Sequence, residues 1–264
     1  MLGGEVMTSK NRHPIIKQML LNDKKVVISD LSARFGVTEE TIRRDLDKFE
    51  AEGFITRTYG GAVLNSVQTV SNIPFFKRAS EKVEEKKQIA ITAAKILRDK
   101  HTIFADSSST VMETVKLLKE RNDLIIVSNS AEMSRELFIS KVNVVSTGGM
   151  LNKQSLSYEG ELAESSVRRY NTEAAVISCK GIDMLTGITD TNETQARLKR
   201  LMIDQADLVI LLADLSKFDK KAFVKLGDFN VVTDIITDQK PSPIWLDFFT
   251  KLGISVHYPQ VTIS

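Results

Sequence analysis

The chain has 264 residues, 42% of them hydrophobic, and a formal net charge of +2, the composition of an ordinary soluble protein with room for one small and one medium-sized domain. It lacks an apolar run of the roughly 20 residues that a membrane span needs, and residues 1–10 contain no hydrophobic signal core, so we expect a cytoplasmic protein that does not enter a membrane. A single cysteine and three widely spaced histidines exclude an internal disulfide and give no metal-ligand pattern, so we expect neither a metal nor a cofactor.

Charge alone does not indicate a nucleic-acid-binding region. Residues 1–65 contain ten Lys or Arg and nine Asp or Glu, a net charge of +1, and the remaining residues also sum to +1. Proteins that bind DNA usually carry a basic patch or stripe. Any DNA-binding function must therefore be inferred from where the basic residues lie.

The N-terminal part begins with two predicted helices separated by a short extended segment. The first helix covers Asn11–Leu21, the extended segment covers Val26–Ile28, and a second, short helix ends at Gly36. Ser29 is expected to cap the second helix. We expect three basic side chains in or next to the first helix to remain available for phosphate groups: Lys10, Arg12 and Lys17.

Residues 38–49 have the pattern of an amphipathic helix. Thr38 is expected at the N-cap, and the two glutamates that follow it suit the positive end of the helix dipole. Gly53 is expected to end the helix in a positive-φ conformation. Apolar residues recur at i, i+4 and i+7 and form a single buried stripe: Ile42, Leu46 and Phe49. Polar and basic residues fall on other faces: Thr41, Arg43, Arg44 and Lys48.

Phe54–Tyr59 alternates between apolar and polar residues and ends at Gly60-Gly61, as a β-wing does. Two helices joined by a glycine-containing turn, followed by such a wing, are typical of a winged helix-turn-helix. We therefore predict a DNA-binding domain over residues 9–64, with its helix-turn-helix from Val26 to Asp45. The alternative is a small helical interaction module whose arginines only solvate one face.

Two motifs make this prediction more specific. Val37–Leu46 reads V-T-E-E-T-I-R-R-D-L, and Arg57–Ala62 reads R-T-Y-G-G-A. Together they resemble the signature of the DeoR family of bacterial transcriptional regulators, which usually has Ser in place of Thr38 and commonly His in place of Tyr59. The resemblance implies that Asp45 orients an arginine. It also implies DNA contacts by the helix, to which its exposed face adds Lys48, and a phosphate contact by the wing: Thr38, Thr41, Arg43, Arg44, Lys48 and Arg57.

Residues 65–80 are expected to form a linker, because Asn, Ser, Gln and Thr precede Pro74. A helix is expected to begin near Phe75 and to run on through the charged stretch Glu81–Lys87. The second domain is predicted over residues 81–264.

From His101 onward, short apolar segments alternate with amphipathic ones. Near-continuous apolar strands with intervening helices are typical of an α/β fold with a doubly wound, mainly parallel sheet. The predicted strands are 102–105, 124–127, 142–145, 174–178, 208–213 and 235–236. The predicted helices are 111–118, 131–138, 161–170, 195–203 and 244–252.

Polar loops follow five of these strands, at the end of the sheet where doubly wound folds bind ligands. The loop Asp106–Thr110 places three serines and a threonine at a helix start, where hydroxyl and N–H groups can hold an anion. Simple N-capping is the alternative for this loop. Gly148 and Gly149 would let the backbone approach a ligand closely. The remaining polar loops are 128–130, 180–183 and 214–218.

These loops resemble the C-terminal sensor domain of the DeoR family, which is similar in fold to ribose-5-phosphate isomerase and typically binds phosphorylated sugars or related metabolites. The chain has Asp106-Ser-Ser-Ser-Thr where the family usually has D-x-G-T-T. The resemblance implies that Ser107–Thr110 bind the phosphate, with Lys86 and Lys217 as cationic partners. Asp106 and Asp183 would bind sugar hydroxyls. The expected effector-binding residues are Lys86, Asp106, Ser107, Ser108, Ser109, Thr110, Asn129, Gly148, Gly149, Asp183 and Lys217.

Four further residues of the second domain have simpler expected roles. Lys199 is a weaker effector-binding candidate, and Glu193 is expected to interact with a helix dipole. Cys179 is expected in the core rather than as a redox switch. Trp245 is expected to pack a terminal helix onto the sheet or onto a partner subunit.

The leading functional hypothesis is a transcriptional regulator, which we expect to repress a carbohydrate operon. It is expected to bind a double-stranded DNA operator as a homodimer or homotetramer and to respond to a phosphorylated sugar or a related metabolite. The rival is a sugar-phosphate isomerase with an added module, for which Asp183, Lys199 and Glu193 are candidate acid–base groups. No compact acid–base constellation follows Gly181, so we expect no enzyme. A dinucleotide-binding oxidoreductase is excluded because the first strand lacks a following G-x-G-x-x-G.

Overall fold

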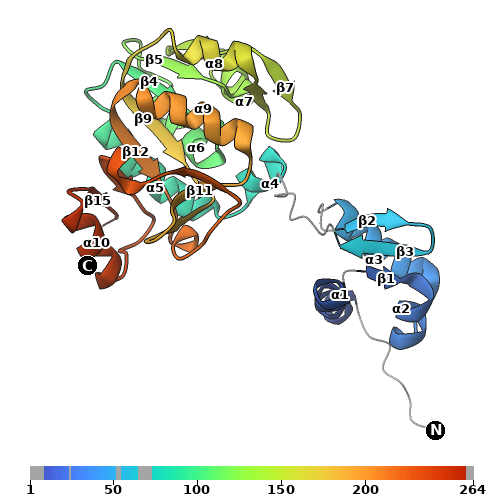
Figure 1. Cartoon of the computed structure of the whole chain (residues 1–264). Coiled ribbons are helices and arrows are strands. Elements are labelled where there is room, and N and C mark those ends of the chain that lie inside the picture. Colours follow the sequence, from blue (N-terminus) through green and yellow to red (C-terminus); the bar gives the residue numbers. More distant parts are fainter. Residues whose placement is uncertain (1–8, 24, 52–54, 65–72, 260–264) are drawn as a thin grey trace. The chain divides into compact units, whose positions relative to one another are not determined.

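The chain forms two compact units, Met1–Ile73 and Pro74–Ser264, in a computed structural model that describes residues 9–23, 25–51, 55–64 and 73–259 (Figure 1). Three predictions lie outside the described residues. They concern Gly53 as the glycine that ends a helix, the start of the wing at Phe54, and the linker over residues 65–72. None of the helices in the described part is both long and apolar enough to cross a lipid bilayer.

The first unit is a winged helix-turn-helix, as predicted. Its elements in chain order are α1 (Ser9–Asp23), β1 (Lys25–Val27), α2 (Ile28–Phe35), α3 (Glu39–Ala51), β2 (Ile55–Thr58) and β3 (Gly61–Leu64). The three strands form an antiparallel sheet in the order β1-β3-β2. The predicted stripe of α3 is buried in a core shared with α1, α2 and the sheet: Ile42, Leu46 and Phe49.

Local sequence explains the turn between α2 and α3. Gly36 ends α2 in the left-handed region, with φ of 61°, a conformation that favours glycine. Thr38 then caps α3, because its Oγ1 accepts the backbone N–H of Thr41 at 3.3 Å. The predicted cap of α2 is wrong: the helix already begins at Ile28, so Ser29 lies inside its first turn.

The second unit is an α/β domain with a seven-stranded sheet in which every neighbouring pair is parallel. The sheet order is β15-β14-β12-β9-β4-β5-β6. Its strands are β4 (Thr102–Ala105), β5 (Ile125–Ser128), β6 (Asn143–Ser146), β9 (Thr172–Ser178), β12 (Ala206–Leu212), β14 (Asp234–Ile236) and β15 (Ser255–His257). The predicted strands correspond to the first six of these, and β15 was not predicted.

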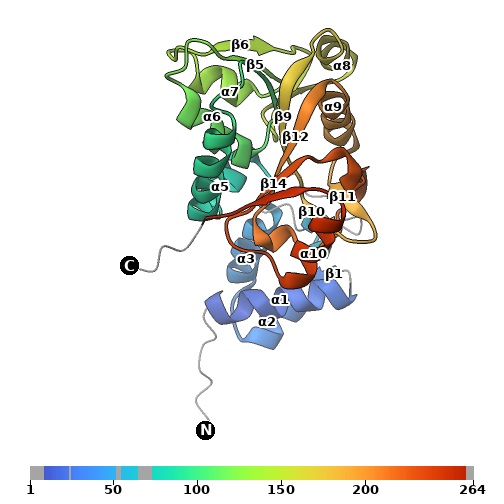
Figure 2. The same cartoon turned by 90° about the vertical axis from the view of Figure 1, so that its left-hand side faces the viewer.

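Helices cover both faces of this sheet, as Figure 2 shows. One core contains apolar residues of α5 (Val83–Ile96), α6 (Ser109–Leu118) and α7 (Ala131–Glu136). The core on the other face contains residues of α8 (Glu161–Val167), α9 (Glu193–Asp204) and α10 (Pro243–Lys251). Alternate residues of each strand enter one core or the other. The strands are therefore apolar on both sides, which is why their sequences read as continuous apolar runs.

Smaller elements surround the sheet. A hairpin consists of β7 (Met150–Asn152) and β8 (Ser157–Glu159), and a three-stranded antiparallel sheet consists of β10 (Gly181–Asp183), β11 (Gly187–Asp190) and β13 (Val224–Gly227). Two 3-10 turns complete the unit: η1 (Leu215–Lys217) and η2 (Phe229–Val231). The sequence did not predict these strands, because each mixes apolar residues with polar residues or glycine and none is a continuous apolar run.

The helix predicted to run on from Phe75 is in fact two helices. α4 (Phe75–Ser80) ends at Glu81, which is extended, and α5 starts after Lys82, which has φ of 51°. The last six residues of the predicted linker therefore form α4, the first helix of the second unit.

The predicted packing of the terminal helix is confirmed. Trp245 of α10 is buried against an aromatic cluster, and its indole N–H donates to Asp219 at 3.1 Å. The rings that contact it are Phe218, Phe229, Phe248 and Phe249.

Candidate functional sites

The exposed side of α3 gathers most of the residues predicted to contact DNA. Thr38, Arg43, Arg44 and Lys48 are exposed and Thr41 is half-buried. Thr41, Arg44 and Lys48 are spaced at i, i+3 and i+7, so they lie on one face, away from the apolar stripe. The side chain of Arg44 is 77% exposed, which leaves its guanidinium accessible to a partner.

Two glutamates of the first turn pair with these arginines. Arg43 Nη2 lies 2.8 Å from Glu39 Oε2, and Arg44 Nε lies 3.5 Å from Glu40 Oε1. Exposed pairs of this kind contribute only about 0–1 kcal/mol to stability. Both arginines can therefore exchange their glutamates for phosphate or base oxygens at little cost.

Asp45 lies on the inner side of α3 and orients an arginine, as the resemblance implied. Arg12 Nε lies 2.6 Å from Asp45 Oδ2, and His13 Nε2 lies 2.8 Å from Asp45 Oδ1. Burial alone would raise the pKa of Asp45, but hydrogen bonds from Arg12 and His13 outweigh burial and lower it. The expectation that Arg12 stays available for phosphate is wrong, because this side chain is buried and joins α1 to α3.

The wing arginine lies against α3. In β2, Arg57 Nη1 contacts Asp47 Oδ1 and lies 3.4 Å from the carbonyl oxygen of Arg43. A phosphate would have to replace Asp47 as its partner, so the phosphate contact of Arg57 stays a prediction. Tyr59, in the turn between β2 and β3, is fully exposed and is the other prominent side chain of the wing.

In the second unit, the strand order reverses between β4 and β9, and we call the carboxyl ends of these two strands the crevice. Parallel α/β sheets bind ligands at such a point. Asp106 joins the two strands there: its N–H donates to Val176 at 3.2 Å, and its Oδ2 accepts the N–H of Ser178 at 3.0 Å. Its other oxygen accepts the N–H of Ser108 at 2.8 Å. Asp106 therefore builds the crevice, and its predicted contact with a sugar hydroxyl stays untested.

The loop after Asp106 contains more hydroxyls than helix capping uses. Ser108 Oγ caps α6 by accepting the N–H of Val111 at 3.1 Å. Ser107, Ser109 and Thr110 are buried, and none of their hydroxyls has a hydrogen bond to another described group. Capping thus explains Ser108, whereas the other three hydroxyls remain able to bind a ligand.

Lys199 of α9 lies beneath this loop at the centre of a buried charge network. Its Nζ lies 3.0 Å from Asp106 Oδ2, 2.6 Å from Asp190 Oδ2 and 2.6 Å from the carbonyl oxygen of Ser178. Burial would lower the pKa of Lys199, but Asp106 and Asp190 outweigh it and the pKa is raised. For Asp190, burial is likewise outweighed by Lys199, so its pKa is lowered. This lysine completes the floor of the crevice.

Two cations that the sequence did not single out lie close to this network. Arg78 of α4 has a pKa lowered by burial, although Asp106 and Asp190 act to raise it. Lys180 follows β9 directly, and burial together with the charge of Arg78 lowers its pKa to about 7. Arg78 was hidden in a predicted linker. The position of Lys180 at a strand end was the signal that could have found it.

The cations named from the resemblance have different surroundings. Lys217, in η1 after β12, is half-buried and close enough to act on the pKa of Lys180, so it lies at the same end of the sheet. Lys86 donates to the carbonyl oxygens of Arg78 and of Glu81, the latter at 2.6 Å, and so caps the end of α4. A phosphate contact by Lys86 would require it to leave these carbonyls.

Asp183 lies in the turn between β10 and β11. Its Oδ1 accepts the N–H of Thr186 at 2.8 Å and lies 3.4 Å from Lys221 Nζ. The hydrogen bond from the Thr186 N–H and the nearby Lys221 together lower the pKa of Asp183. The carboxylate thus stabilises a hairpin turn, and its predicted role toward sugar hydroxyls has no support from these contacts.

The β7–β8 hairpin covers the loops that follow β5 and β6. The backbone oxygen of Asn129 accepts the N–H of Tyr158 at 2.7 Å, and the side-chain oxygen of Asn129 is buried without a hydrogen-bond partner. Gly149 has φ of 112°, and a Cβ there would lie 2.6 Å from the carbonyl oxygen of Glu159. Only glycine fits this approach. Asn129 and Gly149 are therefore brought together with the strand ends, as predicted.

Cys179 is buried next to this site, as predicted for a core residue, and burial raises the pKa of its thiol to about 12. A thiol with such a pKa stays protonated and is a poor nucleophile.

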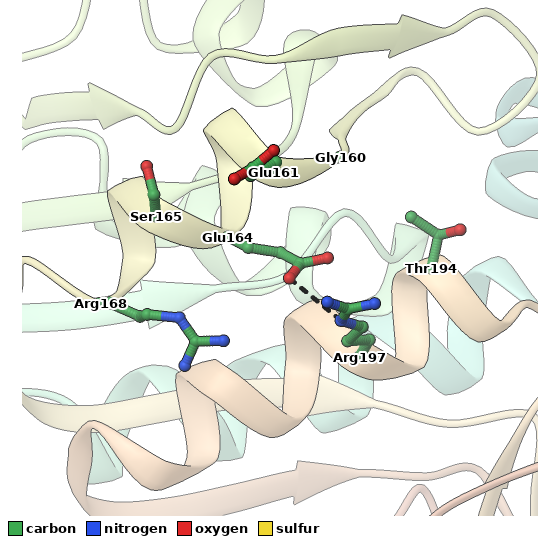
Figure 3. Close-up of a pocket in the computed structure, with 7 residues that line it drawn as sticks. All are labelled: Gly160, Glu161, Glu164, Ser165, Arg168, Thr194 and Arg197. Carbon is green, nitrogen blue, oxygen red and sulfur yellow. Dashed lines mark ion pairs between the residues drawn. The ribbon is translucent and has the colours of Figure 1, made fainter.

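A separate hollow of about 520 Å³ lies between α8 and α9 (Figure 3). Glu164 and Arg197 face each other across it at 3.0 Å. It is lined by Gly160, Glu161, Glu164, Ser165, Arg168, Thr194 and Arg197, none of which was predicted to bind a ligand.

Family models match both units of the chain. The DeoR-like helix-turn-helix domain matches residues 12–68, and the DeoR C-terminal sensor domain matches residues 81–239. A relative is the uncharacterized HTH-type transcriptional regulator YulB of Bacillus subtilis (strain 168), 39% identical over 90% of this chain and 92% of its own. The glycerol-3-phosphate regulon repressor of Escherichia coli (strain K12) is 28% identical over 89% of this chain and 93% of its own.

Solved structures resemble the chain only distantly. Ribose 5-phosphate isomerase A from Methanocaldococcus jannaschii covers 50% of this chain and 53% of its own, with a TM-score of 0.38 and 15% identity. A likeness of this size says nothing about ligand or activity.

Proposed function

The chain belongs to the DeoR family of DNA-binding transcriptional regulators, and we propose that it represses a carbohydrate operon. A phosphorylated sugar, bound at the carboxyl ends of β4 and β9, would change its affinity for DNA. The glycerol-3-phosphate regulon repressor, a relative over nearly its whole length, supports repression, and its name links it to the genes of a phosphorylated compound. Binding to a chromosomal operator would place this action in the cytoplasm.

The exposed face of α3 supports operator binding in the major groove. Thr41, Arg44 and Lys48 project from a helix whose other side is buried, as a recognition helix requires. Arginine can make two hydrogen bonds to a guanine edge, whereas lysine at the end of such a helix suits a phosphate. A homodimer or homotetramer would place two such helices about 34 Å apart, one turn of DNA.

The observation that carries the effector proposal is the convergence of anion-binding groups at one crevice. Three hydroxyls of buried residues, none of them hydrogen-bonded to another described group, lie at the start of α6, where the helix dipole favours negative charge. Three cations lie at the same end of the sheet: Arg78, Lys180 and Lys217. The side chain of Lys180 has no hydrogen bond or ion pair with another described group, which suits it to pair with a phosphate.

The rival proposal of an isomerase finds no support in the candidate acid–base groups. Asp183 is held by a hairpin turn, and Lys199 is held by two carboxylates. Glu193 pairs with Arg200 at 2.9 Å on the surface. A general base must reach the proton that it abstracts, and none of these three is free to do so.

Replacing Arg44 by alanine should weaken specific operator binding by about 1–3 kcal/mol and leave binding to random DNA almost unchanged, because a base contact is lost. The measurement is an electrophoretic mobility shift on a fragment selected from random sequences by the unmodified protein, with unselected DNA for comparison. Arg98→Ala, at an exposed position of the second unit, is the control. Equal losses on both DNAs for Arg44→Ala would contradict base readout.

Replacing Ser108 by aspartate should abolish the rise in melting temperature that a phosphorylated sugar causes. Aspartate caps a helix as well as serine does, so α6 should form, but its charge would repel a phosphate. The measurement is a thermal shift with glucose 6-phosphate, fructose 1-phosphate, ribose 5-phosphate and glycerol 3-phosphate. Ser242→Asp, at the start of α10, is the matched control. An undiminished shift in Ser108→Asp would rule out the proposed site.

A further inference from the structure

Arg78 reaches the proposed effector crevice from α4, the first helix of the second unit. α4 begins at Phe75, two residues after the first unit ends at Ile73. The guanidinium of Arg78 stacks on the ring of Phe75, with 5.6 Å from Cζ to the ring centroid, and it interacts electrostatically with Asp106 and Asp190. The same residue is therefore close to the crevice in space and close to the DNA-binding unit in sequence.

α4 is attached to its surroundings at both ends. At its start, Phe75 is buried in the core of α5 and α6, and its N–H donates to the carbonyl oxygen of Gln154, in the turn of the β7–β8 hairpin, at 2.8 Å. At its end, Lys86 Nζ donates to the carbonyl oxygens of Arg78 and Glu81. The hairpin that covers the crevice is thus directly joined to α4.

α4 is nevertheless a separate helix. The extended Glu81 and the left-handed Lys82 interrupt the helical hydrogen bonds between α4 and α5. Lys82 Nζ pairs with Asp214 at 2.9 Å, which fixes the start of α5 to the loop after β12. A six-residue helix bounded by such a break can shift against α5 without unwinding it.

The charges around Arg78 change when a phosphate enters. In the unliganded crevice, Asp106 and Asp190 are each already within 3.0 Å of Lys199 Nζ, and their charges also act on Arg78. A phosphate at Ser107–Thr110 would carry up to two negative charges, and a guanidinium pairs with phosphate through two parallel hydrogen bonds. Arg78 would then be drawn toward the phosphate and would carry α4 with it.

We propose that Arg78 contacts the effector's phosphate and that the resulting shift of α4 transmits occupancy of the crevice to the DNA-binding unit. This rests on the proposed effector function and adds the residue and the helix through which it acts. Coupling between two sites needs an element that both sites bias. α4 meets this condition, because it carries a side chain of the crevice and leads directly into the chain that joins the two units.

The test compares Arg78→Met with Lys77→Met, which removes the same charge from an exposed position of the same helix. The affinity of each full-length protein for the selected DNA fragment is measured with and without a saturating concentration of whichever of the four sugar phosphates raises the melting temperature of the unmodified protein most. In the unmodified protein and in Lys77→Met, the compound should change DNA affinity by about 5- to 150-fold, the usual range of allosteric coupling. In Arg78→Met, the compound should change DNA affinity by less than twofold.

A second measurement separates transmission from a structural role of Arg78. Hydrogen exchange of residues 74–81 should respond to the compound in the unmodified protein and in Lys77→Met, but not in Arg78→Lys, which keeps the charge but lacks the planar fork. A full response of DNA affinity in a folded Arg78→Met protein would overturn the proposal while leaving the effector function intact. If none of the four compounds alters the melting temperature or the DNA affinity of the unmodified protein, the effector function itself fails, and this proposal fails with it.

Discussion

Replacement of Lys199 by methionine is expected to lower the free energy of unfolding of the second unit by about 3–5 kcal/mol at pH 7. The ammonium of Lys199 is buried within 3.0 Å of two carboxylates, those of Asp106 and Asp190. Methionine fills a similar volume but leaves both carboxylates buried without their main counter-charge. Breaking a buried ion pair from one side is costly for this reason.

The fluorescence of Trp245 provides the measurement, because it is the one tryptophan of the chain and it is buried in the second unit. Urea unfolding followed at this residue reports the second unit alone. Lys225→Met, which removes an exposed partner of Asp228, is the matched control and should change stability by less than about 1 kcal/mol. An equally small effect of Lys199→Met would show that the network contributes little.

The loss should depend on pH in a defined direction. The pKa of Asp190 is lowered in the native protein, so Asp190 contributes stability above its unfolded pKa of about 4 and loses that contribution as pH falls through the native value. In Lys199→Met, the same carboxyl lacks its counter-charge and its pKa should rise. Lowering the pH from 7 to 5 should therefore reduce the difference in the free energy of unfolding between Lys199→Met and the unmodified protein. Urea unfolding midpoints at pH 5, 6 and 7 measure this difference.

In the first unit, Asp45→Ala is expected to cost about 3–5 kcal/mol and to abolish DNA binding, although Asp45 does not face outward. Asp45 is 3% exposed, and Arg12, its partner, is equally buried. Alanine would leave the Arg12 guanidinium buried without its carboxylate and would loosen α1 from α3. The recognition helix would then lose its support.

Circular dichroism and the mobility shift together measure this effect. In Asp45→Ala, part of the helical circular dichroism signal should be lost at a lower temperature than in the unmodified protein. The midpoint temperature of the transition seen by Trp245 fluorescence should not change. Asp47→Ala, which removes an exposed carboxylate of the same helix, is the control and should retain DNA binding. DNA binding by Asp45→Ala at unmodified affinity would argue against the structural role assigned to the pair.

Much of the fold could be predicted because its signals are local and repeated. The buried stripe of α3 has helical spacing, and the core strands are apolar on both sides because helices cover both faces. The elements that escaped prediction have no such signal. β15 and the strands of the hairpin mix apolar and polar residues within three positions, and the break between α4 and α5 depends on the left-handed conformation of one lysine.

The candidate site was predicted less completely, because side-chain partners depend on the tertiary structure. Asp106–Thr110 could be found from its serines at a strand end, and Gly149 from its glycine pair. Nothing in the sequence indicated that Lys86 would cap α4 while Arg78 reached the crevice. Lys180 follows a strand and Lys199 lies in a helix, and only the folded chain shows that Lys199 lies within 3.0 Å of two carboxylates.

The double pairing of Lys199 has a consequence for what the regulator can detect. Since that ammonium is already neutralised by two aspartates, it offers no attraction to an incoming molecule. An uncharged sugar would gain hydrogen bonds from the serines but would offer no negative charge to Arg78 and Lys180. The protein would then not respond to the unphosphorylated sugar found outside the cell. It would respond only after a kinase or a phosphorylating transporter had phosphorylated that sugar.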